Sequence, residues 1–416
     1  MKAAILGYGK SGQTAKRLLE IKGTETIEIY DDKMDGFKGI KDFNYEEFDT
    51  VVVSPGIDLT NIDLPTERIT SELELAFEFI KDKKIIGITG TNGKSTVTFL
   101  TAQLLKNIGI NAEFCGNIGV TVGDTYLLKN PDVYVVEVSS FQLDLLKRFR
   151  FDTSTITNIT PDHLDRYKTM DRYITSKSRM VEFTEGVSFL EKGGWNEIFK
   201  KYENIKYVDG ELKSYPLLNG NLLEFEDFYV DVNRYNLFGF HNIVNLSFAL
   251  LLTNQIVRLK GDVTGLVENL TPLEHRCELV TEINGVKYIN DSKGTNVDST
   301  LTALKSSSYP TTLILGGKDK NGDFSVLSDE INKKAKLVIC CGAAGEKIYN
   351  SLKDIIDVKI VRVELLKDAI SLAYRETKEG TVLFSPACAS FDEFNNFEER
   401  GRFFKNYVNN LKVRGC

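Results

Sequence analysis

The 416-residue sequence predicts an α/β protein built on parallel sheets, and three observations lead to this prediction. Short apolar runs alternate with segments whose apolar residues recur at helical spacing, which is typical of strand–helix–strand units. Polar or glycine-rich turns follow many of these runs, at the strand ends where open α/β sheets bind their ligands. The length fits two to four domains, and a hydrophobic content of 42% is enough to build their cores.

Composition narrows the possible functions. The net charge is −7 and the pI is about 5.4, which argues against nonspecific binding to nucleic acid or to an anionic membrane. The six cysteines show no CxxC spacing and are typical of reduced thiols in a cytoplasmic protein. No segment has the character of a signal peptide or a membrane span. We therefore expect a cytoplasmic protein that acts on small molecules, and nothing in the sequence demands more than a monomer.

The first predicted domain, residues 1–81, is Rossmann-like. A strand at Ala3–Leu6 is followed by the G-x-G-x-x-G turn Gly7-Tyr8-Gly9-Lys10-Ser11-Gly12 and by a helix that extends through Leu19. The acids Asp31-Asp32 come about twenty residues later, as in proteins that bind NAD. The pattern predicts a nucleotide-binding turn without naming its ligand.

Three more elements complete this domain, namely strands at Thr26–Tyr30 and Thr50–Val53 and a helix at Ser71–Ile80. The tight turn Ser54-Pro55-Gly56 directly follows the second of these strands. Because it follows a strand's carboxyl end, we expect it at the ligand-binding edge of the sheet.

The second predicted domain, residues 82–272, is organised around the phosphate loop Gly90-Thr91-Asn92-Gly93-Lys94-Ser95-Thr96. This loop lies between a strand at Ile85–Ile88 and a helix at Val97–Ile108, and it shortens the usual pattern to G-x-x-G-K-S. Glycines let backbone N–H groups approach an anion, and the helix N-terminus adds a favourable dipole. In such loops the lysine, here Lys94, neutralises phosphates, and the hydroxyl of Ser95 binds Mg²⁺. The sequence therefore predicts a nucleotide phosphate site.

Two further strand ends in this domain carry polar groups. Glu137 lies within the apolar strand Tyr134–Val138, which indicates a central strand, where an unpaired carboxylate is costly and a bound cation offsets the cost. The alternative is an edge strand with Glu137 facing solvent. A strand at Thr155–Ile159 leads into Asp162-His163, where an imidazole can reach a metal or a phosphate. Hairpin strands near 205–230 and a helix at 242–257 complete the domain.

The third predicted domain, residues 273–416, again alternates strands and helices. Its predicted strands are Lys287–Ile289, Thr312–Leu315, Lys336–Cys340 and Thr381–Phe384, and its helices lie near 297–305, 325–333, 365–376 and 395–411. Polar groups gather after three of these strands, in Asp291–Asn296, Gly316–Lys320 and Ser385–Ser390. Together these strand ends predict a substrate site. The alternative for Asp291 or Ser292 is a simple helix N-cap.

Several motifs resemble, in order and spacing, the Mur ligases of peptidoglycan synthesis over essentially the whole chain. They are the phosphate loop, Glu137–Leu143, Asp162–Asp165, His241-Asn242, His275-Arg276 and Asp291–Lys293. The stretches Ser385–Asp392 and Phe397–Gly401 are most similar to the branch of this family that adds D-glutamate, and so are the two N-terminal turns.

The resemblance implies three α/β domains, which bind a UDP-sugar, ATP and an amino acid in that order. It also implies that the C-terminal, amino-acid-binding domain has a dinucleotide-type fold. It also implies an ATP-dependent amide ligase in peptidoglycan precursor synthesis, with two Mg²⁺ sites. In the family reaction ATP phosphorylates the terminal carboxylate of UDP-N-acetylmuramoyl-L-alanine. The amine of D-glutamate then attacks the acyl phosphate through a tetrahedral intermediate. Phosphorylation supplies the leaving group that a carboxylate lacks, and clustered cations offset the charge of the phosphoryl group.

The resemblance further implies roles for single residues. Lys94, His163, Lys177 and Lys320 match catalytic positions. The ATP set is the phosphate loop with Asn242, Arg276, Asp291 and Lys293. The metal set is Ser95, Glu137, His163 and Lys177, the last as a carbamate, because carbamylation turns an ammonium into an anionic oxygen ligand. The UDP-substrate set is Gly9, Lys10, Ser11, Asp31, Asp32, Ser54, Pro55, Gly56 and Asn117. The D-glutamate set is Asp162, Thr295, Lys320, Ser390 and Phe397.

Several alternatives stay open at this point. Lys177 can also be read as a solvent-facing helical lysine, and either Lys318 or Lys320 can face the amino acid. A sister Mur ligase or a folylpolyglutamate synthase would share most of the motifs. An NAD-dependent oxidoreductase would leave Lys94 and Glu137 unexplained. A nucleotide-binding regulator without catalysis would need neither Lys320 nor Ser390.

Overall fold

Strands and helices alternate along the chain in the computed structural model, which describes residues 1–57, 59, 64–193, 195–235 and 239–414. The chain divides into two compact units, Met1–Tyr235 with Val244–Leu270, and Asn236–Ile243 with Thr271–Cys416. The predicted α/β class with parallel sheets is confirmed. The domain boundaries predicted at residues 81–82 and 272–273 stay predictions. Among the described residues, no helix is both long enough and apolar enough to span a membrane.

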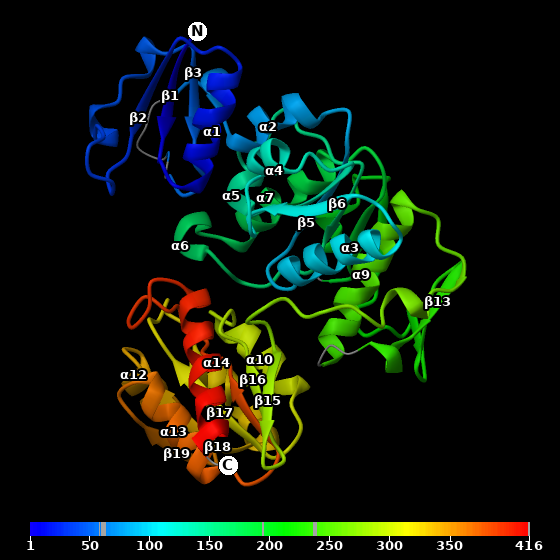
Figure 1. The fold of residues 1–416 in the computed structure, drawn as a ribbon, viewed down its shortest axis with the longest axis vertical. Helices are drawn as coiled ribbons and strands as arrows, with labels where there is room; N and C mark the ends of the chain where they lie inside the picture. Colours follow the sequence, from blue (N-terminus) through cyan, green and yellow to red (C-terminus); the bar gives the residue numbers. More distant parts are fainter. Residues whose placement is uncertain (58, 60–63, 194, 236–238, 415–416) are drawn as a thin grey trace. The chain divides into compact units, whose positions relative to one another are not determined.

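The first sheet, drawn in blue in Figure 1, has four parallel strands in the order β2-β1-β3-β4. Its elements are β1 (Lys2–Leu6), α1 (Lys10–Ile21), β2 (Thr26–Tyr30), β3 (Thr50–Val53), β4 (Ile69–Thr70) and α2 (Glu72–Ile80). A Cβ atom at Gly12 would lie 2.2 Å from the carbonyl oxygen of Gly7. The last glycine of the predicted turn is therefore required by the close packing of α1 on β1.

The second sheet has six parallel strands in the order β10-β9-β8-β5-β7-β6. These strands are β5 (Lys84–Thr89), β6 (Ala112–Gly116), β7 (Val133–Glu137), β8 (Thr153–Ile156), β9 (Ser188–Glu191) and β10 (Ile205–Val208). The helices between them are α3 (Lys94–Asn107), α4 (Val122–Leu128), α5 (Ser140–Leu143), α6 (Leu164–Tyr167), α7 (Met170–Glu182) and α8 (Asn196–Phe199). β7 lies between β5 and β6, so the prediction of a central strand for Glu137 is confirmed.

A small third sheet corrects one prediction. The region 205–230 was expected to form hairpins, but β10 pairs in parallel with β9, and the antiparallel pairing begins only after it. The sheet contains β11 (Leu217–Asn219), β12 (Leu222–Glu224), β13 (Phe228–Asp231) and β14 (Gly261–Asp262), and α9 (Phe240–Ile256) lies between the last two in sequence. The alternation of exposed and buried residues in β13 suits a strand with only one covered face.

The second unit contains a six-stranded sheet in the order β15-β16-β20-β17-β18-β19, parallel except for β15. Its strands are β15 (Glu278–Ile283), β16 (Val286–Asn290), β17 (Thr311–Gly316), β18 (Ala335–Cys341), β19 (Lys359–Arg362) and β20 (Thr381–Phe384). Its helices are α10 (Val297–Ser306), α11 (Ser328–Lys334), α12 (Gly345–Leu352), α13 (Leu366–Glu376) and α14 (Phe397–Arg414). One core cluster joins the sheet to α10, α11 and α12, and another joins it to α13 and α14. The sheet is therefore covered on both faces, as parallel sheets require.

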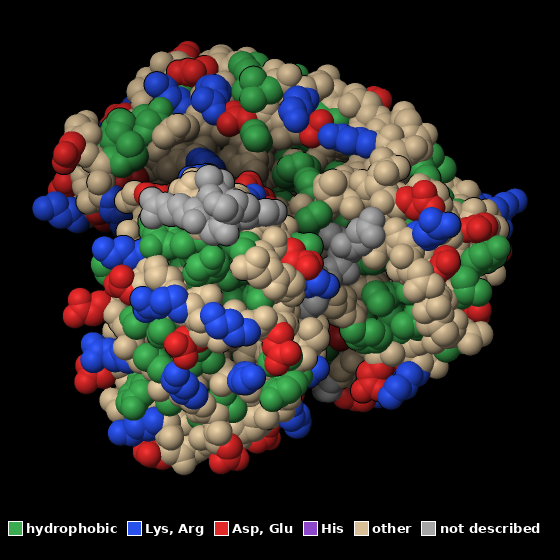
Figure 2. All heavy atoms as spheres, turned by 60° about the horizontal axis from the view of Figure 1, so that its bottom comes forward, with side chains coloured by type: hydrophobic (Ala, Val, Ile, Leu, Met, Phe, Trp, Pro, Cys, Tyr) green, Lys and Arg blue, Asp and Glu red, His purple; other side chains and the backbone are tan. Residues whose placement is uncertain are grey.

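Figure 2 shows basic and acidic side chains interspersed over the face that it displays. This mixture is consistent with the modest net charge of −7. It gives no indication on that face of the single-sign patch that nonspecific binding to a polyanion requires.

Glu74 connects the first two sheets of the first unit. Its side chain is 2% exposed, and its Oε1 accepts hydrogen bonds from the backbone N–H groups of Lys147, Arg148 and Phe149 at 2.7, 2.9 and 2.9 Å. One carboxylate oxygen on α2 thus satisfies three donors in the loop after α5. A buried donor that loses its acceptor costs about 1–3 kcal/mol.

We expect Glu74→Ala to destabilise this junction by about 3 kcal/mol, because three backbone N–H groups, of which that of Phe149 is buried, lose their acceptor. Hydrogen exchange at the amides of residues 147–149 would report the change as lost protection. Glu74→Gln keeps an acceptor oxygen and should retain most of the protection, and Glu67→Ala on the exposed surface is the control. Unchanged exchange in Glu74→Ala would contradict the assignment.

Candidate active site

The phosphate loop joins β5 to α3 as predicted, and two of its glycines are required by close neighbours. Gly90 has φ +145° and Gly93 has φ +82°. A Cβ at Gly90 would lie 2.0 Å from the Thr157 hydroxyl oxygen, and one at Gly93 would lie 2.5 Å from Oδ1 of Asn245. No other residue fits either position without displacing these side chains.

A neighbouring strand end fixes the course of the loop. The backbone N–H of Asn92 donates to Oδ1 of Asn158 at 2.8 Å, and the N–H of Thr91 donates to the carbonyl of the same residue at 2.9 Å. The Thr91 hydroxyl lies 3.2 Å from the Tyr173 hydroxyl. Ser95 and Thr96 are buried in the first turn of α3. These contacts hold the loop against the chain that follows β8.

Two lysine side chains converge on the carbonyl oxygen of Gly90. Lys94 Nζ donates to it at 2.9 Å, and Lys177 Nζ donates to it at 2.7 Å. Lys94 also donates to the carbonyl of Thr91 at 2.8 Å. Lys177 lies on α7, which is distant in the sequence from the phosphate loop, and its Nζ contacts the loop in the folded chain. Its side chain is 1% exposed, so the alternative of a solvent-facing lysine is wrong.

The environment of Lys177 favours an uncharged amine. Burial holds its pKa well below the usual range, and the positive charge of Lys94 acts in the same direction. The ring centroid of Tyr173 lies 4.7 Å from Nζ. A neutral amine has the free electron pair that attack on carbon dioxide requires, whereas an ammonium does not.

Glu137 ends β7 at the same edge of the sheet and is 2% exposed. Its Oε1 accepts a hydrogen bond from Nδ2 of Asn117 at 2.8 Å. The sequence assigned these two residues to different ligands, the metal and the UDP substrate, and the structure places them in contact. Asn117 therefore orients the carboxylate. Its contribution to Glu137 could not be read from the sequence because the two strands are neighbours only in the sheet.

His163 precedes α6 with φ +53°, and its side chain is 42% exposed. Its ring packs against Phe141, with 4.9 Å between centroids. Asp162 accepts a hydrogen bond from the backbone N–H of His163 at 2.9 Å. Phe141 also lies under the guanidinium of Arg166 at 4.1 Å, and Arg166 donates to the carbonyl of Pro55 at 3.0 Å. Sequence reasoning missed the contacts of Phe141 and Arg166, which connect the two predicted sites.

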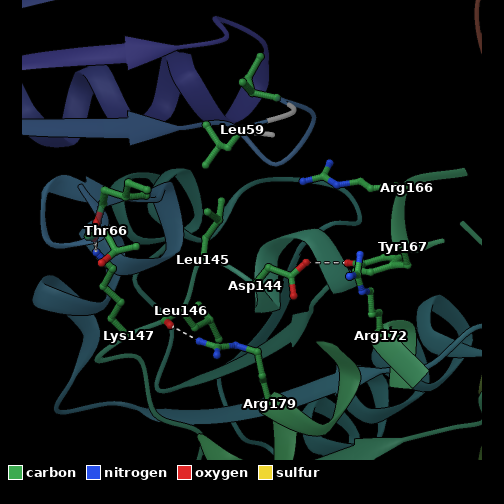
Figure 3. A pocket seen from close by; sticks show the side chains of 12 residues that line it. Leu59, Thr66, Asp144, Leu145, Leu146, Lys147, Arg166, Tyr167, Arg172 and Arg179 are labelled. Atoms are coloured by element: carbon green, nitrogen blue, oxygen red, sulfur yellow. Dashed lines mark hydrogen bonds between the residues drawn. The ribbon is translucent and has the colours of Figure 1, made fainter. Parts of the chain in front are cut away.

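Beside these residues lies a cavity of about 560 Å³ between the chain after β3 and the helices α5, α6 and α7. Figure 3 shows Asp144, which accepts a hydrogen bond from the Tyr167 hydroxyl at 2.7 Å, and Arg179, which donates to the carbonyl of Leu146 at 2.6 Å. The rest of the described lining combines apolar and basic side chains, namely Ile57, Leu59, Thr66, Ile69, Leu145, Lys147, Arg166 and Arg172.

The predicted UDP-substrate residues other than Asn117 lie at the carboxyl edge of the first sheet, and several of them shape that edge. Oδ2 of Asp31 accepts from the N–H of Tyr8 at 2.7 Å, and backbone donors lower the pKa of Asp31. Asp32 accepts from the N–H of Ile40 at 2.8 Å. The Ser54 hydroxyl donates to the carbonyl of Gly7 at 2.7 Å and joins the two strand ends.

The remaining members of this set are more open to solvent. Gly9 and Lys10 are exposed, and Ser11 and Pro55 are half-buried. Gly56 follows in the same turn and is exposed. These groups are therefore accessible to a ligand, while Asp31, Asp32 and Ser54 hold the loops that present them.

In the second unit Asp291 is 5% exposed and links two strand ends. Its Oδ2 accepts from the Ser385 hydroxyl at 2.6 Å, and its Oδ1 accepts from the N–H of Cys277 at 3.2 Å. Burial raises its pKa to about 6. The N-cap of α10 is Asn296, whose side chain accepts from the N–H of Ser299, so the N-cap alternative for Asp291 or Ser292 is wrong.

The other predicted residues of this unit gather around the same strand ends. Lys293 Nζ lies 5.2 Å from the ring centroid of Phe397. Nε of Arg276 is buried, and among the described residues it has no hydrogen-bond partner. Ser390 is 2% exposed, whereas Thr295 is half-buried and Lys320 is exposed. Lys318 is also exposed, so the choice between the two lysines stays open.

The half-buried imidazole of His241 adjoins the predicted nucleotide residue Asn242. Its Nδ1 lies 2.8 Å from the Ser306 hydroxyl oxygen. Burial lowers the pKa of His241 to about 4, and the charge of Arg276 contributes. Free histidine has a pKa of about 6.5. Between these values the unfolded chain binds a proton that the folded chain does not, so folding stability is lost as pH falls through this window.

Comparison with known proteins identifies the family to which this chain belongs. Residues 88–253 match the Mur ligase middle domain, and residues 275–388 match the Mur ligase, glutamate ligase domain. The chain belongs to the Mur ligase family, and the resemblance found in the sequence is confirmed.

Two relatives of this chain have the same name. A protein of Caldicellulosiruptor saccharolyticus, named UDP-N-acetylmuramoylalanine--D-glutamate ligase, is 36% identical over 99% of this chain and 99% of its own length. A protein of Francisella tularensis subsp. holarctica with the same name is 34% identical over 99% of this chain and 97% of its own.

Solved structures share the fold at low identity. UDP-N-acetylmuramate-alanine ligase MurC from Thermotoga maritima has a TM-score of 0.59 at 17% identity, covering 99% of this chain and 100% of its own. MurF ligase from the same organism, in complex with ADP, has a TM-score of 0.62 at 15% identity, covering 91% and 94%.

We expect His241→Asn to reduce the acid sensitivity of the protein, because the amide keeps a polar partner for Ser306 but does not titrate. The wild-type chain should lose up to about 3 kcal/mol of stability through His241 between pH 6.5 and pH 4. Thermal unfolding of both proteins at pH 7.5 and pH 4.5 measures this. Equal losses on acidification would contradict the burial of a neutral imidazole.

Proposed function

We propose that this chain is an ATP-dependent ligase that joins D-glutamate to UDP-N-acetylmuramoyl-L-alanine. The observation that carries the proposal is similarity across 99% of the chain to two proteins named for this reaction. The phosphate loop, with Lys94 and Lys177 beneath it, agrees with the ATP-dependent step. The sister-ligase alternative has weaker support, because the MurC and MurF structures are only 17% and 15% identical to the chain.

In the proposed reaction the first unit activates the carboxylate. Backbone N–H groups of the phosphate loop and the ammonium of Lys94 hold the phosphates of ATP, and Asn117 keeps the Glu137 carboxylate oriented. Ser95, Glu137, His163 and carbamylated Lys177 offer hydroxyl, carboxylate, imidazole and carbamate ligands that suit two Mg²⁺ ions. When bound, these ions offset the negative charge of the transferring phosphoryl group.

The second unit binds the amine in this proposal. Lys320 supplies positive charge for a carboxylate of D-glutamate, and Thr295, Ser390 and Phe397 shape the rest of its site. Asn242, Arg276, Asp291 and Lys293 bind the nucleotide. The UDP-sugar lies at the carboxyl edge of the first sheet, against the turns at residues 9–11 and 54–56. In this proposal the main ligands of the domains 1–81, 82–272 and 273–416 are the UDP-sugar, ATP and the amino acid, and Arg276, Asp291 and Lys293 of the third domain also contact the nucleotide.

The decisive measurement is phosphate release from Mg-ATP with UDP-N-acetylmuramoyl-L-alanine and one amino acid at a time. We expect release to require D-glutamate and to be at background with L-glutamate, L-lysine or meso-diaminopimelate. A site whose polar groups pair with both carboxylates and the amine of D-glutamate distinguishes it from L-glutamate, because the L-enantiomer leaves some of these groups unpaired. Release with another amino acid would assign the chain to a sister activity, and no release with any of them would refute the proposal.

Lys177→Ala should lose ligase activity, and added bicarbonate should not restore it, because the side chain that carries the carbamate is gone. Glu182→Ala, an exposed position on the same helix, is the control and should keep normal turnover. The ¹³C NMR spectrum of the wild-type protein in ¹³C-bicarbonate should contain a carbamate signal that the variant lacks. Normal activity of Lys177→Ala would remove Lys177 from the metal set.

A further inference from the structure

Arg400 is a buried cation at the beginning of α14. The residue is 2% exposed, and the carboxyl groups of Asp392 and Asp291 act on it through their charge. Burial lowers its pKa to about 10, which still leaves the guanidinium charged at neutral pH. A buried charge of this kind persists only where hydrogen bonds replace the lost water.

Four hydrogen bonds provide this compensation. Nε donates to the Ser292 hydroxyl at 3.0 Å, and Nη2 donates to the Ser292 carbonyl at 2.8 Å. Nη2 also donates to the carbonyl of Cys388 at 3.1 Å, and Nη1 donates to the carbonyl of Ala389 at 3.0 Å. The planar fork thus spans two loops, one after β16 and one after β20.

These loops carry the residues proposed to bind substrates. Ser292 lies between Asp291 and Lys293, and Ala389 immediately precedes Ser390. A third loop is in contact as well, because a Cβ placed on Gly317, after β17, would lie 2.9 Å from Nη1 of Arg400. The strands β16, β20 and β17 are neighbours in the sheet. One guanidinium therefore joins the loops after β16 and β20 and lies close to the loop after β17.

The same contacts fix the start of α14. The Ser292 hydroxyl donates to the carbonyl of Phe397 at 2.9 Å while it accepts from Arg400. Phe397 is itself a proposed contact of the amino acid. The hydroxyl is thereby shared between the arginine and the backbone of that residue, and movement of one would displace the other.

We propose that Arg400 is the positioning residue of the amino-acid site. It touches no substrate in this arrangement and acts by holding the Ser292 and Ala389 loops at a fixed separation. Lysine cannot replace it, because a single ammonium at the end of a flexible chain does not reach acceptors on both loops in the geometry of a planar fork. The inference rests on the proposed function, since it concerns the site of the amino acid in that reaction.

Arg400→Lys tests the proposal, with Arg402→Lys as the matched control, because Arg402 lies two residues further along the same helix and is exposed. We expect Arg400→Lys to raise the KM for D-glutamate at least about 10-fold and to lower kcat. The KM for UDP-N-acetylmuramoyl-L-alanine should stay within about 2-fold, because that substrate is proposed to bind the first unit. Arg402→Lys should match the wild type.

Ser292→Ala provides an independent variant if Arg400→Lys does not fold. It removes one acceptor of the guanidinium and leaves the charge in place, and we expect a smaller rise of about 3-fold in the KM for D-glutamate. Equal changes in the KM values of both substrates would indicate a merely structural arginine. A wild-type KM for D-glutamate in the folded Arg400→Lys protein, or in Ser292→Ala where Arg400→Lys does not fold, would also overturn the proposal.

The test of Arg400 and the test of the proposed function rest on different measurements. Wild-type turnover with D-glutamate is measured first, and it alone decides the identity of the acceptor. If the wild-type protein uses a different amino acid, the same KM comparison is made with that amino acid. The role of Arg400 is then judged on its own result.

Discussion

The carbonyl oxygen of Gly90 is the point on which the active centre of the first unit depends. It accepts hydrogen bonds from both Lys94 and Lys177, and this is possible only because the loop turns back at a glycine with φ +145°. A side chain at that position would collide with Thr157. The conformation of the loop, the packing of β8 beside it and the position of α7 therefore depend on one another and form a single structural constraint. Through that constraint Lys177 becomes buried and holds a pKa well below its ordinary range.

The two units hold positively charged side chains in the same way. Lys94 and Arg400 donate to backbone carbonyl oxygens of the loops that they support. A carbonyl carries no net charge, so it solvates the cation without cancelling the positive potential that an anionic substrate needs. It also ties the cation to the backbone rather than to a flexible side chain. Preorganised charge of this kind requires little rearrangement during the reaction.

Much of this architecture could be predicted from sequence, because local patterns determine strands and glycine turns. β2, β3 and β20 have the predicted bounds, and the phosphate loop lies between β5 and α3 as expected. Polar residues that follow apolar strands were correctly placed at sheet edges, as for Glu137 and Asp291. The strand at 155–159 was placed too late, since β8 ends at Ile156, because apolar Ile159 extends the pattern into the loop.

Contacts between distant segments could not be predicted. The partnership of Asn117 with Glu137 depends on β6 lying beside β7, and that of Arg166 with Pro55 depends on how the first two sheets pack. The resemblance to a family named Lys177, but only the fold explains its altered acidity. Likewise Asp291 precedes a helix in the sequence, yet it is held by Ser385 and Cys277 from other strands. Register and sheet order are long-range properties, and a single sequence gives little access to them.

The site residues fall into a buried group and an exposed group, and the two groups contribute differently to ligand binding. Glu137, Lys177, Asp291 and Ser390 are buried, so folding itself has already met the cost of their desolvation. His163 and Lys320 remain accessible to water, and their desolvation must be met when a ligand binds. A group whose interaction forms only with bound ligand contributes nothing to folding, but it can distinguish the bound state from the free one. The buried groups therefore define the shape of the site, and the exposed groups make its completion depend on the substrates.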